Sequence, residues 1–162
     1  MKTSVLIIAF LSFNITLCQN SKREKMIEHF VVDLFNNDIS ALKVVEKYID
    51  IEPDKMNSFS FSERKKMVVG IIEETRKGTF SPWFYPDYSI KNIENPKVFS
   101  YKIHKNKSDL KINGIDKIKE NVYVLLDSKG EKIMQYFLLN KTKIISFNLL
   151  VKEKGEASFF SY

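Results

Sequence analysis

Residues 122–139 read VYVLLDSKGEKIMQYFLL, and this stretch decides the fold. Two apolar runs, Val122–Leu126 and Ile133–Leu139, flank the turn sequence Asp127-Ser128-Lys129-Gly130. Short runs that are apolar on both faces are typical of central strands, and a glycine-containing turn between two such runs is typical of a hairpin. The sequence therefore predicts an antiparallel hairpin, buried on both faces, at the centre of a sheet.

Further strands are predicted on both sides of this hairpin. Residues 99–104 alternate apolar and polar side chains, which is the period of a strand. Residues 143–151 and 157–161 are predicted as the last two strands. The segment 105–120 is ambiguous, although Asn113-Gly114 within it favours a hairpin turn. The predicted buried face of the strand 143–151 consists of Ile145, Phe147, Leu149 and Val151, and its mixed face of Ile144, Ser146, Asn148 and Leu150.

Three helices are predicted before the strands. Over residues 21–35, Ser21 and Glu24 have the spacing of a capping box, and an apolar stripe follows at helical period. Residues 41–49 are predicted as a second helix with Ser40 as its cap. The apolar residues assigned to the buried faces of these two helices are Met26, Ile27, Phe30, Val31, Leu34, Phe35, Leu42, Val45, Tyr48 and Ile49.

A third helix is predicted from Ser60 or Ser62 to Gly78. Ser60 and Glu63 repeat the capping-box spacing, and glycine is a typical residue just past a helix end. Gly70 in the helix interior costs about 1 kcal/mol of helix propensity relative to alanine. Close packing against a strand or a bound ligand would offset that cost. The apolar residues of this helix are Met67, Val68, Ile71 and Ile72.

The order of helices followed by strands predicts an α+β fold, with three N-terminal helices packed on a curved, mostly antiparallel sheet of four to six strands. Asn37-Asp38 precedes the second helix, and the strands lead to the segment 143–151. In these features residues 22–151 resemble the nuclear-transport-factor-2-like, cystatin-like cones of many small secreted bacterial proteins. The resemblance implies a concave sheet face under the helices. Members usually place a strand before the third helix, whereas residues 51–60 form a poor strand.

Residues 1–18 are predicted to be a secretory signal peptide, which leaves residues 19–162 as one α+β domain. The segment starts with a positive charge, and its apolar part is too short to span a bilayer. Thr16 and Cys18 occupy the small-residue positions before a cleavage site ahead of Gln19. Lipidation of Cys18 is the alternative, against which the bulky Leu17 argues. We expect a secreted or periplasmic protein, or alternatively a lipoprotein anchored at Cys18.

Composition excludes most classes of enzyme. The chain has two His and one Cys, too few for a Cys/His zinc site or a Cys-His nucleophile pair. The sequence lacks the motifs of phosphate-binding loops, dinucleotide-binding folds, hydrolase elbows and zinc proteases. We therefore expect no metal and no cofactor.

The formal net charge of +6 does not indicate nucleic-acid binding. Arginine, which bidentate contacts to bases and phosphates favour, occurs only as Arg23, Arg64 and Arg76. The lysines are scattered among acidic residues, which is typical of a solvated surface. We expect no nucleic-acid partner. No run of residues is long and apolar enough for an integral membrane span.

The densest unusual feature is the segment Phe80–Tyr88, which holds five aromatic residues and two prolines. Because proline restricts the backbone, the segment is suited either to wall an apolar site or to plug the end of the sheet. Its candidate ligand-binding residues are Trp83, Phe84, Tyr85 and Tyr88. The polar residues that the cone would turn toward its concave face are Tyr123, Gln135, Tyr136, Ser146 and Asn148, of which Gln135 and Asn148 are the candidate ligand-binding residues.

Neither histidine indicates a catalytic site. His29 and Asp33 stand four residues apart on the first helix, where polar pairs are routine surface features. His104 is expected on the polar face of a strand. The sequence favours non-catalytic binding of a small apolar ligand, a peptide or a partner protein. The alternatives are a cone enzyme that transfers protons through Asp33, Asp87 or Tyr85, and a purely structural envelope protein.

Overall fold

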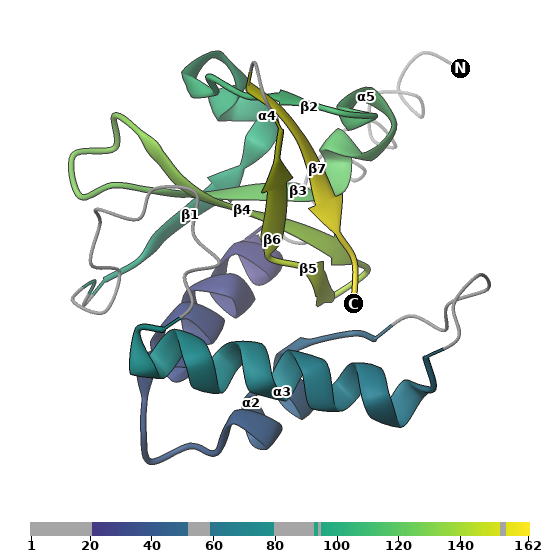
Figure 1. Cartoon of the computed structure of the whole chain (residues 1–162). Helices are drawn as coiled ribbons and strands as arrows, with labels where there is room; N and C mark the ends of the chain where they lie inside the picture. Colours follow the sequence, from purple (N-terminus) through teal and green to yellow (C-terminus); the bar gives the residue numbers. More distant parts are fainter. Residues whose placement is uncertain (1–20, 52–58, 80–92, 94, 153–154) are drawn as a thin grey trace, which may run out of the picture.

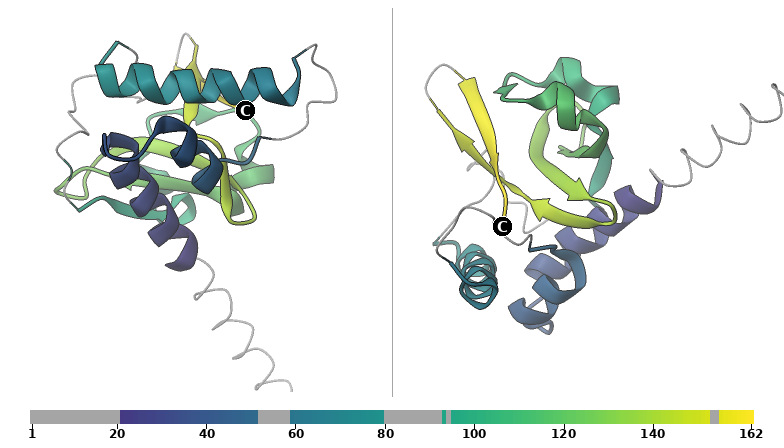
Figure 2. Two further views of the ribbon diagram at one scale, coloured as in Figure 1. Left: turned by 90° about the horizontal axis from the view of Figure 1, so that it is seen from below. Right: turned by 90° about the vertical axis from the view of Figure 1, so that its right-hand side faces the viewer.

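The computed structural model describes residues 21–51, 59–79, 93, 95–152 and 155–162. Within these residues the chain has the predicted α+β architecture, in which helices precede the strands. The three N-terminal helices gather on one side of the strands, and the last two strands stand on the other side of the central hairpin (Figures 1 and 2). The predicted fold class is confirmed.

The first three helices are residues 21–35, α2 (Ala41–Tyr48) and α3 (Phe61–Lys77). At the start of α2 the Ser40 side chain accepts a hydrogen bond from the backbone N–H of Lys43. Ser60 and Glu63 form the predicted capping box at the start of α3, and Gly78 ends the helix with a φ of 78°. Polar caps at the start and a left-handed glycine at the end fix these boundaries, as the sequence predicted.

Three details of the helices differ from the prediction. Residue 21 is already helical, so Ser21 is not a cap, and the carboxylate of Glu24 accepts the backbone N–H of Ser100 instead. Leu42 is 45% exposed, because α2 turns its other apolar face to the core. A Cβ added at Gly70 would meet no atom within 4 Å, so close packing does not offset the cost of this glycine.

The strands form two sheets. The larger sheet is antiparallel with the order β1-β3-β4-β5, and the smaller has the order β2-β7-β6, in which β2 and β7 run parallel. The strands are β1 (Lys97–Ser100), β2 (Lys111–Ile112), β3 (Val122–Leu126), β4 (Ile133–Asn140), β5 (Lys143–Ser146), β6 (Asn148–Val151) and β7 (Glu156–Phe160).

The hairpin β3–β4 is the predicted centre of the fold. In its turn the backbone N–H of Gly130 donates to the carbonyl of Asp127 at 2.9 Å. Every residue of β3 is buried, and so is every residue of β4 except Asn140. The hairpin is buried on both faces because the helices cover one face and the smaller sheet with the short helices covers the other.

Two strand predictions were wrong in extent. β1 ends at Ser100 and the short helix α4 (Tyr101–His104) follows, so four of the six residues in the predicted strand 99–104 are helical. The predicted strand 143–151 is two strands that belong to different sheets and meet at Phe147.

The side chain of Ser146 accounts for the break between β5 and β6. Its hydroxyl accepts the backbone N–H of Asn148 and donates to the carbonyl of the same residue, which bends the chain around the buried Phe147. Because of this bend, the side chains of residues 143–151 are not divided into the predicted buried face and mixed face. Ile144 is fully buried, whereas Val151 is 48% exposed.

The ambiguous segment 105–120 is mostly short helices. It contains η2 (Lys105–Lys107), β2, α5 (Ile115–Ile118) and the start of η3 (Lys119–Asn121). Gly114 has a φ of 71° and makes the predicted turn. The turn leads from β2 into α5, however, so it does not join two strands of a hairpin.

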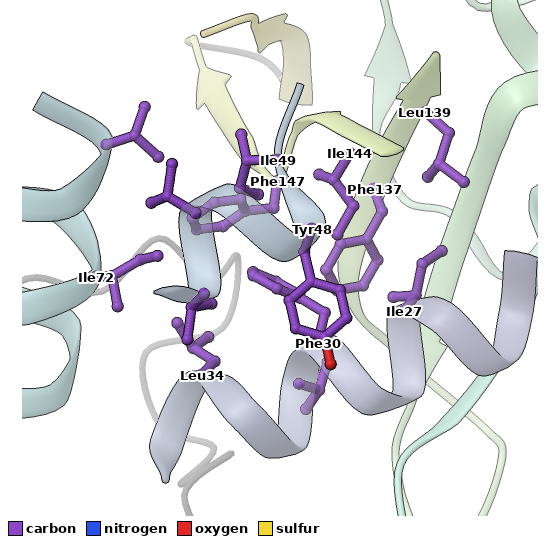
Figure 3. Close-up of a cluster of buried hydrophobic side chains, with 14 of the residues drawn as sticks. Ile27, Phe30, Leu34, Tyr48, Ile49, Ile72, Phe137, Leu139, Ile144 and Phe147 are labelled. Atoms are coloured by element: carbon purple, nitrogen blue, oxygen red, sulfur yellow. The ribbon is translucent and has the colours of Figure 1, made fainter. Parts of the chain in front are cut away.

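The helix-side core centres on Phe30, which has no exposed surface. Its ring lies 5.6 Å from the ring of Tyr48, 6.2 Å from that of Phe137 and 5.2 Å from that of Phe147 (Figure 3). These partners come from α2, β4 and the bend after β5. One side chain therefore joins the first helix to α2 and to the larger sheet.

Arg76 ties the end of the first helix to α3. Its guanidinium donates to the carbonyls of Leu34 at 2.7 Å, Ile39 at 2.7 Å and Asp33 at 3.1 Å. The last carbonyls of a helix have no partner within the helix, so this arginine satisfies groups that the first helix leaves open. It also holds the turn before α2.

Both edges of the larger sheet are covered by the helical part of the chain. Along β1 the carboxylates of Glu28 and Glu24 accept the backbone N–H groups of Val98 at 3.4 Å and Ser100 at 3.2 Å. A helix advances about 6 Å in four residues and a strand covers a similar distance in two, so the two spacings match. Along β5 the segment after α2 adds a parallel bridge at Ile49.

Candidate functional site

The candidate ligand-binding residues of the sheet lie in the protein core. Gln135 is buried and donates from Nε2 to the carbonyl of Phe147. Asn148 is also buried, and its Oδ1 accepts a hydrogen bond from the hydroxyl of Tyr162. The structure therefore brings both residues to the bend at Phe147, where they hydrogen-bond within the protein. The other four candidates, Trp83, Phe84, Tyr85 and Tyr88, lie outside the described residues, as does the whole segment 80–88.

The remaining polar residues assigned to the concave face do not share one face. Tyr123 belongs to the helix-side core, whereas Tyr136 belongs to the core on the opposite face of the sheet. The register explains this separation, because Tyr123 pairs with Phe137, the residue next to Tyr136, and successive residues point to opposite faces. The hydroxyl of Tyr136 donates to Ser108 at 2.8 Å. These side chains do not converge on one site.

The best candidate site is an apolar pocket between α3 and the residues at the end of β7. Its volume is about 190 Å³. One wall is a helical stripe with the spacing i, i+3, i+4, i+7, and consists of Arg64, Met67, Val68 and Ile71. The other wall consists of Phe59, Phe160, Ser161 and Tyr162.

Sequence reasoning missed this pocket because it treated Met67 as a core residue. Met67 is 46% exposed, and Phe59 and Phe160 are likewise exposed, although all three are apolar. Phe59 immediately precedes the cap of α3, a position that the helix pattern does not include. The signal that was available is the run of apolar and aromatic residues around that cap, with Phe61 on its other side.

A second, more open groove lies between α2 and α3. It is lined by Leu42, Ser62, Lys65, Lys66, Val69, Gly70 and Glu73. Charges of both signs line it, and Lys65 forms an ion pair with Glu46 at 2.7 Å. This groove has the mixed character of an ordinary surface, so we do not take it as the site.

A polar cluster of Asp33, Lys47 and Tyr48 joins the first helix to α2. Asp33 Oδ2 accepts hydrogen bonds from Tyr48 at 2.5 Å and from Lys47 at 2.9 Å, and the Lys47 ammonium lies 4.7 Å from the Tyr48 ring centre. Burial acts to raise the pKa of Asp33, but the hydrogen bonds from Tyr48 and Lys47 outweigh it and hold the pKa below its usual value. His29, which is exposed, adds only a weaker electrostatic effect on the same carboxylate.

His104 ends the short helix α4 instead of lying on a strand as predicted. Its ring packs edge-on against Phe99, with 5.0 Å between the ring centres. Burial lowers the pKa of His104, and the nearby Lys107 lowers it further. This histidine therefore packs against Phe99, which borders the core on the face of the larger sheet away from the three N-terminal helices.

We expect Asp33→Asn to lower the free energy of unfolding at pH 7 by about 1 kcal/mol, because it weakens two hydrogen bonds to an ionised carboxylate. A carboxyl with a lowered pKa stabilises the fold fully above its unfolded pKa of about 3.8, and this contribution is lost as the pH falls through the lower folded value. Urea unfolding at pH 7 and at several values below pH 4 measures both effects.

The loss in free energy of unfolding caused by Asp33→Asn should therefore be smaller at the lowest pH values than at pH 7. Asp116→Asn is the matched control, since the Asp116 side chain is 90% exposed and its removal should change little. Equal deficits at all pH values would contradict the expected role of the Asp33 carboxylate.

Three further observations bear on the site. The described part of the chain contains no group of three or more His, Cys, Asp or Glu side chains placed to hold a metal ion. Among the same residues, no helix has the length and apolar character that a membrane crossing requires. Comparisons with protein-family models, with curated proteins and with solved structures gave no match.

Proposed function

We propose that this chain is an exported, non-catalytic binding domain that takes up a small apolar ligand in the pocket between α3 and β7. The single observation that carries the proposal is the exposure of Phe59, Met67 and Phe160 around one concave apolar site. Apolar side chains exposed singly are ordinary, but several that converge on a pocket mark a binding site.

The size of the pocket limits what it takes up. Its volume of about 190 Å³ is larger than the cavities of roughly 150 Å³ that hold benzene, and smaller than the roughly 300–1,000 Å³ typical of drug-sized ligands. A single alkyl chain or a small ring system of one or two rings fits this range. The pocket therefore supports a small apolar ligand better than it supports a large cofactor.

The enzyme alternative gains little from Asp33, the one of its three candidate residues that the structure describes. A carboxyl acting as a general acid near neutral pH needs a raised pKa, whereas the pKa of Asp33 is lowered by its hydrogen-bond donors. Asp33 also lies away from the pocket lining. The other two candidates, Asp87 and Tyr85, fall outside the described residues. The structural alternative would need no pocket at all.

Two further parts of the proposal rest on the sequence. Export depends on residues 1–18 and the cleavage pattern at Cys18 and Gln19, which lie outside the described residues. The resemblance to cystatin-like cones is supported by helices that cover one face of an antiparallel sheet. That family resemblance would place a ligand under the helices, whereas the pocket proposed here lies at the side of α3 facing β7.

A neutral naphthylamine dye, which fluoresces more strongly in apolar surroundings, tests the binding proposal. We expect saturable binding to the full chain, and Met67→Gln should weaken it about threefold to tenfold because a partly buried apolar contact is lost. Leu42→Gln is the matched control, since Leu42 is 45% and Met67 46% exposed, and both changes preserve helix propensity. Absence of saturable binding, or equal weakening by both variants, would overturn the proposed function.

A further inference from the structure

We infer that the ligand of this pocket is a small planar aromatic molecule of one or two rings, which packs against the aromatic side chains of the wall opposite α3. This inference rests on the proposed function and names the chemical class of its ligand. It depends on three observations: the aromatic character of that wall, the position of its rings at the exposed rim of the pocket, and the engagement of the polar groups in the lining.

The wall opposite α3 is largely aromatic. Phe59, Phe160 and Tyr162 supply three of its four described residues, and Ser161 is the fourth. The rings of Phe160 and Tyr162 lie 6.2 Å apart between their centres, with 71° between their planes, which is an edge-on arrangement. At such distances aromatic rings attract one another beyond the effect of the apolar area that they bury. A ligand ring placed in the pocket would extend this group of rings.

The pocket has a buried floor and an exposed apolar rim. Val68 and Tyr162 are almost fully buried, whereas Phe59, Met67 and Phe160 are exposed around the opening. The two phenylalanine rings therefore keep surface that a ligand can cover. Met67, on the helical wall, has a flexible side chain whose sulfur makes favourable contacts with aromatic rings. A flat aromatic ring would thus gain specific contacts from both walls.

The polar groups of the described lining do not select a charged ligand. The Tyr162 hydroxyl donates to Oδ1 of Asn148, and Arg64 has an interaction partner within the chain. Ser161 is exposed to solvent. A ligand in this pocket is therefore held by apolar and aromatic contacts, and a polar group that it carries would point to the water at the rim.

Titrations of the full chain with 2-naphthol and with its saturated counterpart, decahydro-2-naphthol, test the inference. The two alcohols share one carbon skeleton and are uncharged at pH 7, but only 2-naphthol is aromatic and flat. We expect 2-naphthol to bind about tenfold more tightly, because it forms ring contacts that a saturated ring cannot make. A pocket that selected for apolar area alone would bind the saturated alcohol at least as tightly. Calorimetry or amide chemical shifts measure both affinities.

Substitution then assigns the preference to the aromatic wall. Phe160→Leu removes a ring but keeps an apolar side chain, so it should lower the preference for 2-naphthol to about threefold or less. Binding of decahydro-2-naphthol should stay within about twofold, which would show that the pocket of this variant is intact. Phe61→Leu is the matched control, since Phe61 is an exposed phenylalanine beside the cap of α3 and lies outside the lining given above. It should preserve the preference.

The outcomes separate this inference from the proposed function. Equal or tighter binding of decahydro-2-naphthol to the unmodified chain would overturn the inference, and so would a ratio of the two affinities that Phe160→Leu leaves unchanged. In either case saturable binding of the dye would leave the proposed function standing. Failure of both alcohols and of the dye to bind would overturn both.

Discussion

Phe30→Ala is expected to lower the free energy of unfolding by about 3–5 kcal/mol, the usual cost of emptying a large buried aromatic site. Phe30 has no exposed surface, and its ring meets aromatic rings from α2, β4 and the bend after β5. Removing it leaves a cavity where the first helix, α2 and the larger sheet meet (Figure 3). Equilibrium urea unfolding, followed by circular dichroism, measures the loss.

Val32→Ala is the control for this prediction. Val32 lies on the same helix but is 47% exposed, so its truncation should change the free energy of unfolding by less than about 0.5 kcal/mol. A loss below about 1 kcal/mol for Phe30→Ala would show that the three aromatic partners repack into the space, contrary to our expectation.

Arg76→Ala is expected to cost about 2–4 kcal/mol, because carbonyls at the end of the first helix and before α2 lose a charged hydrogen-bond donor. The three carbonyl acceptors belong to Asp33, Leu34 and Ile39, and the guanidinium is partly buried among them. Arg76→Lys should recover only part of the loss, since one ammonium cannot reproduce the geometry of the guanidinium fork. Urea unfolding of both variants measures the difference.

Lys77→Ala provides the matched control, because Lys77 follows Arg76 on α3 and its side chain is 63% exposed. Its removal should have little effect on the free energy of unfolding. If Arg76→Ala were no more destabilising than Lys77→Ala, water would satisfy the same carbonyls and the arginine would not hold the helices together.

The parts of the fold that could be predicted are those with local causes. Ser40, Ser60 and Gly78 end or begin helices through contacts within a few residues, and their effects follow from the sequence alone. The hairpin at residues 122–139 was predictable because burial on both faces leaves an apolar pattern and Gly130 supplies the turn. In both cases the determining residues are close together along the chain.

The parts that could not be predicted depend on residues far apart in the sequence. The strand 143–151 divides at Phe147, whose ring packs against Phe30 of the first helix, and period-two alternation does not reveal this contact. The pocket arises where α3 meets the end of β7, so Met67 and Phe160 line the same pocket although they are far apart in the sequence. Arg76 likewise contacts carbonyls about forty residues away, as in its bond to Ile39.

The two glutamates along β1 also bear on how this protein behaves at high concentration. An uncovered edge strand is a template onto which another chain adds, and such growth leads to aggregation. To add at β1, an incoming strand would have to displace the Glu24 and Glu28 carboxylates from the N–H groups of β1. It would offer neutral carbonyls in their place, and a neutral carbonyl is a weaker acceptor than a carboxylate. The first helix therefore has two roles. It packs on one face of the larger sheet, and its glutamates oppose the addition of another chain at β1, which would lead to aggregation.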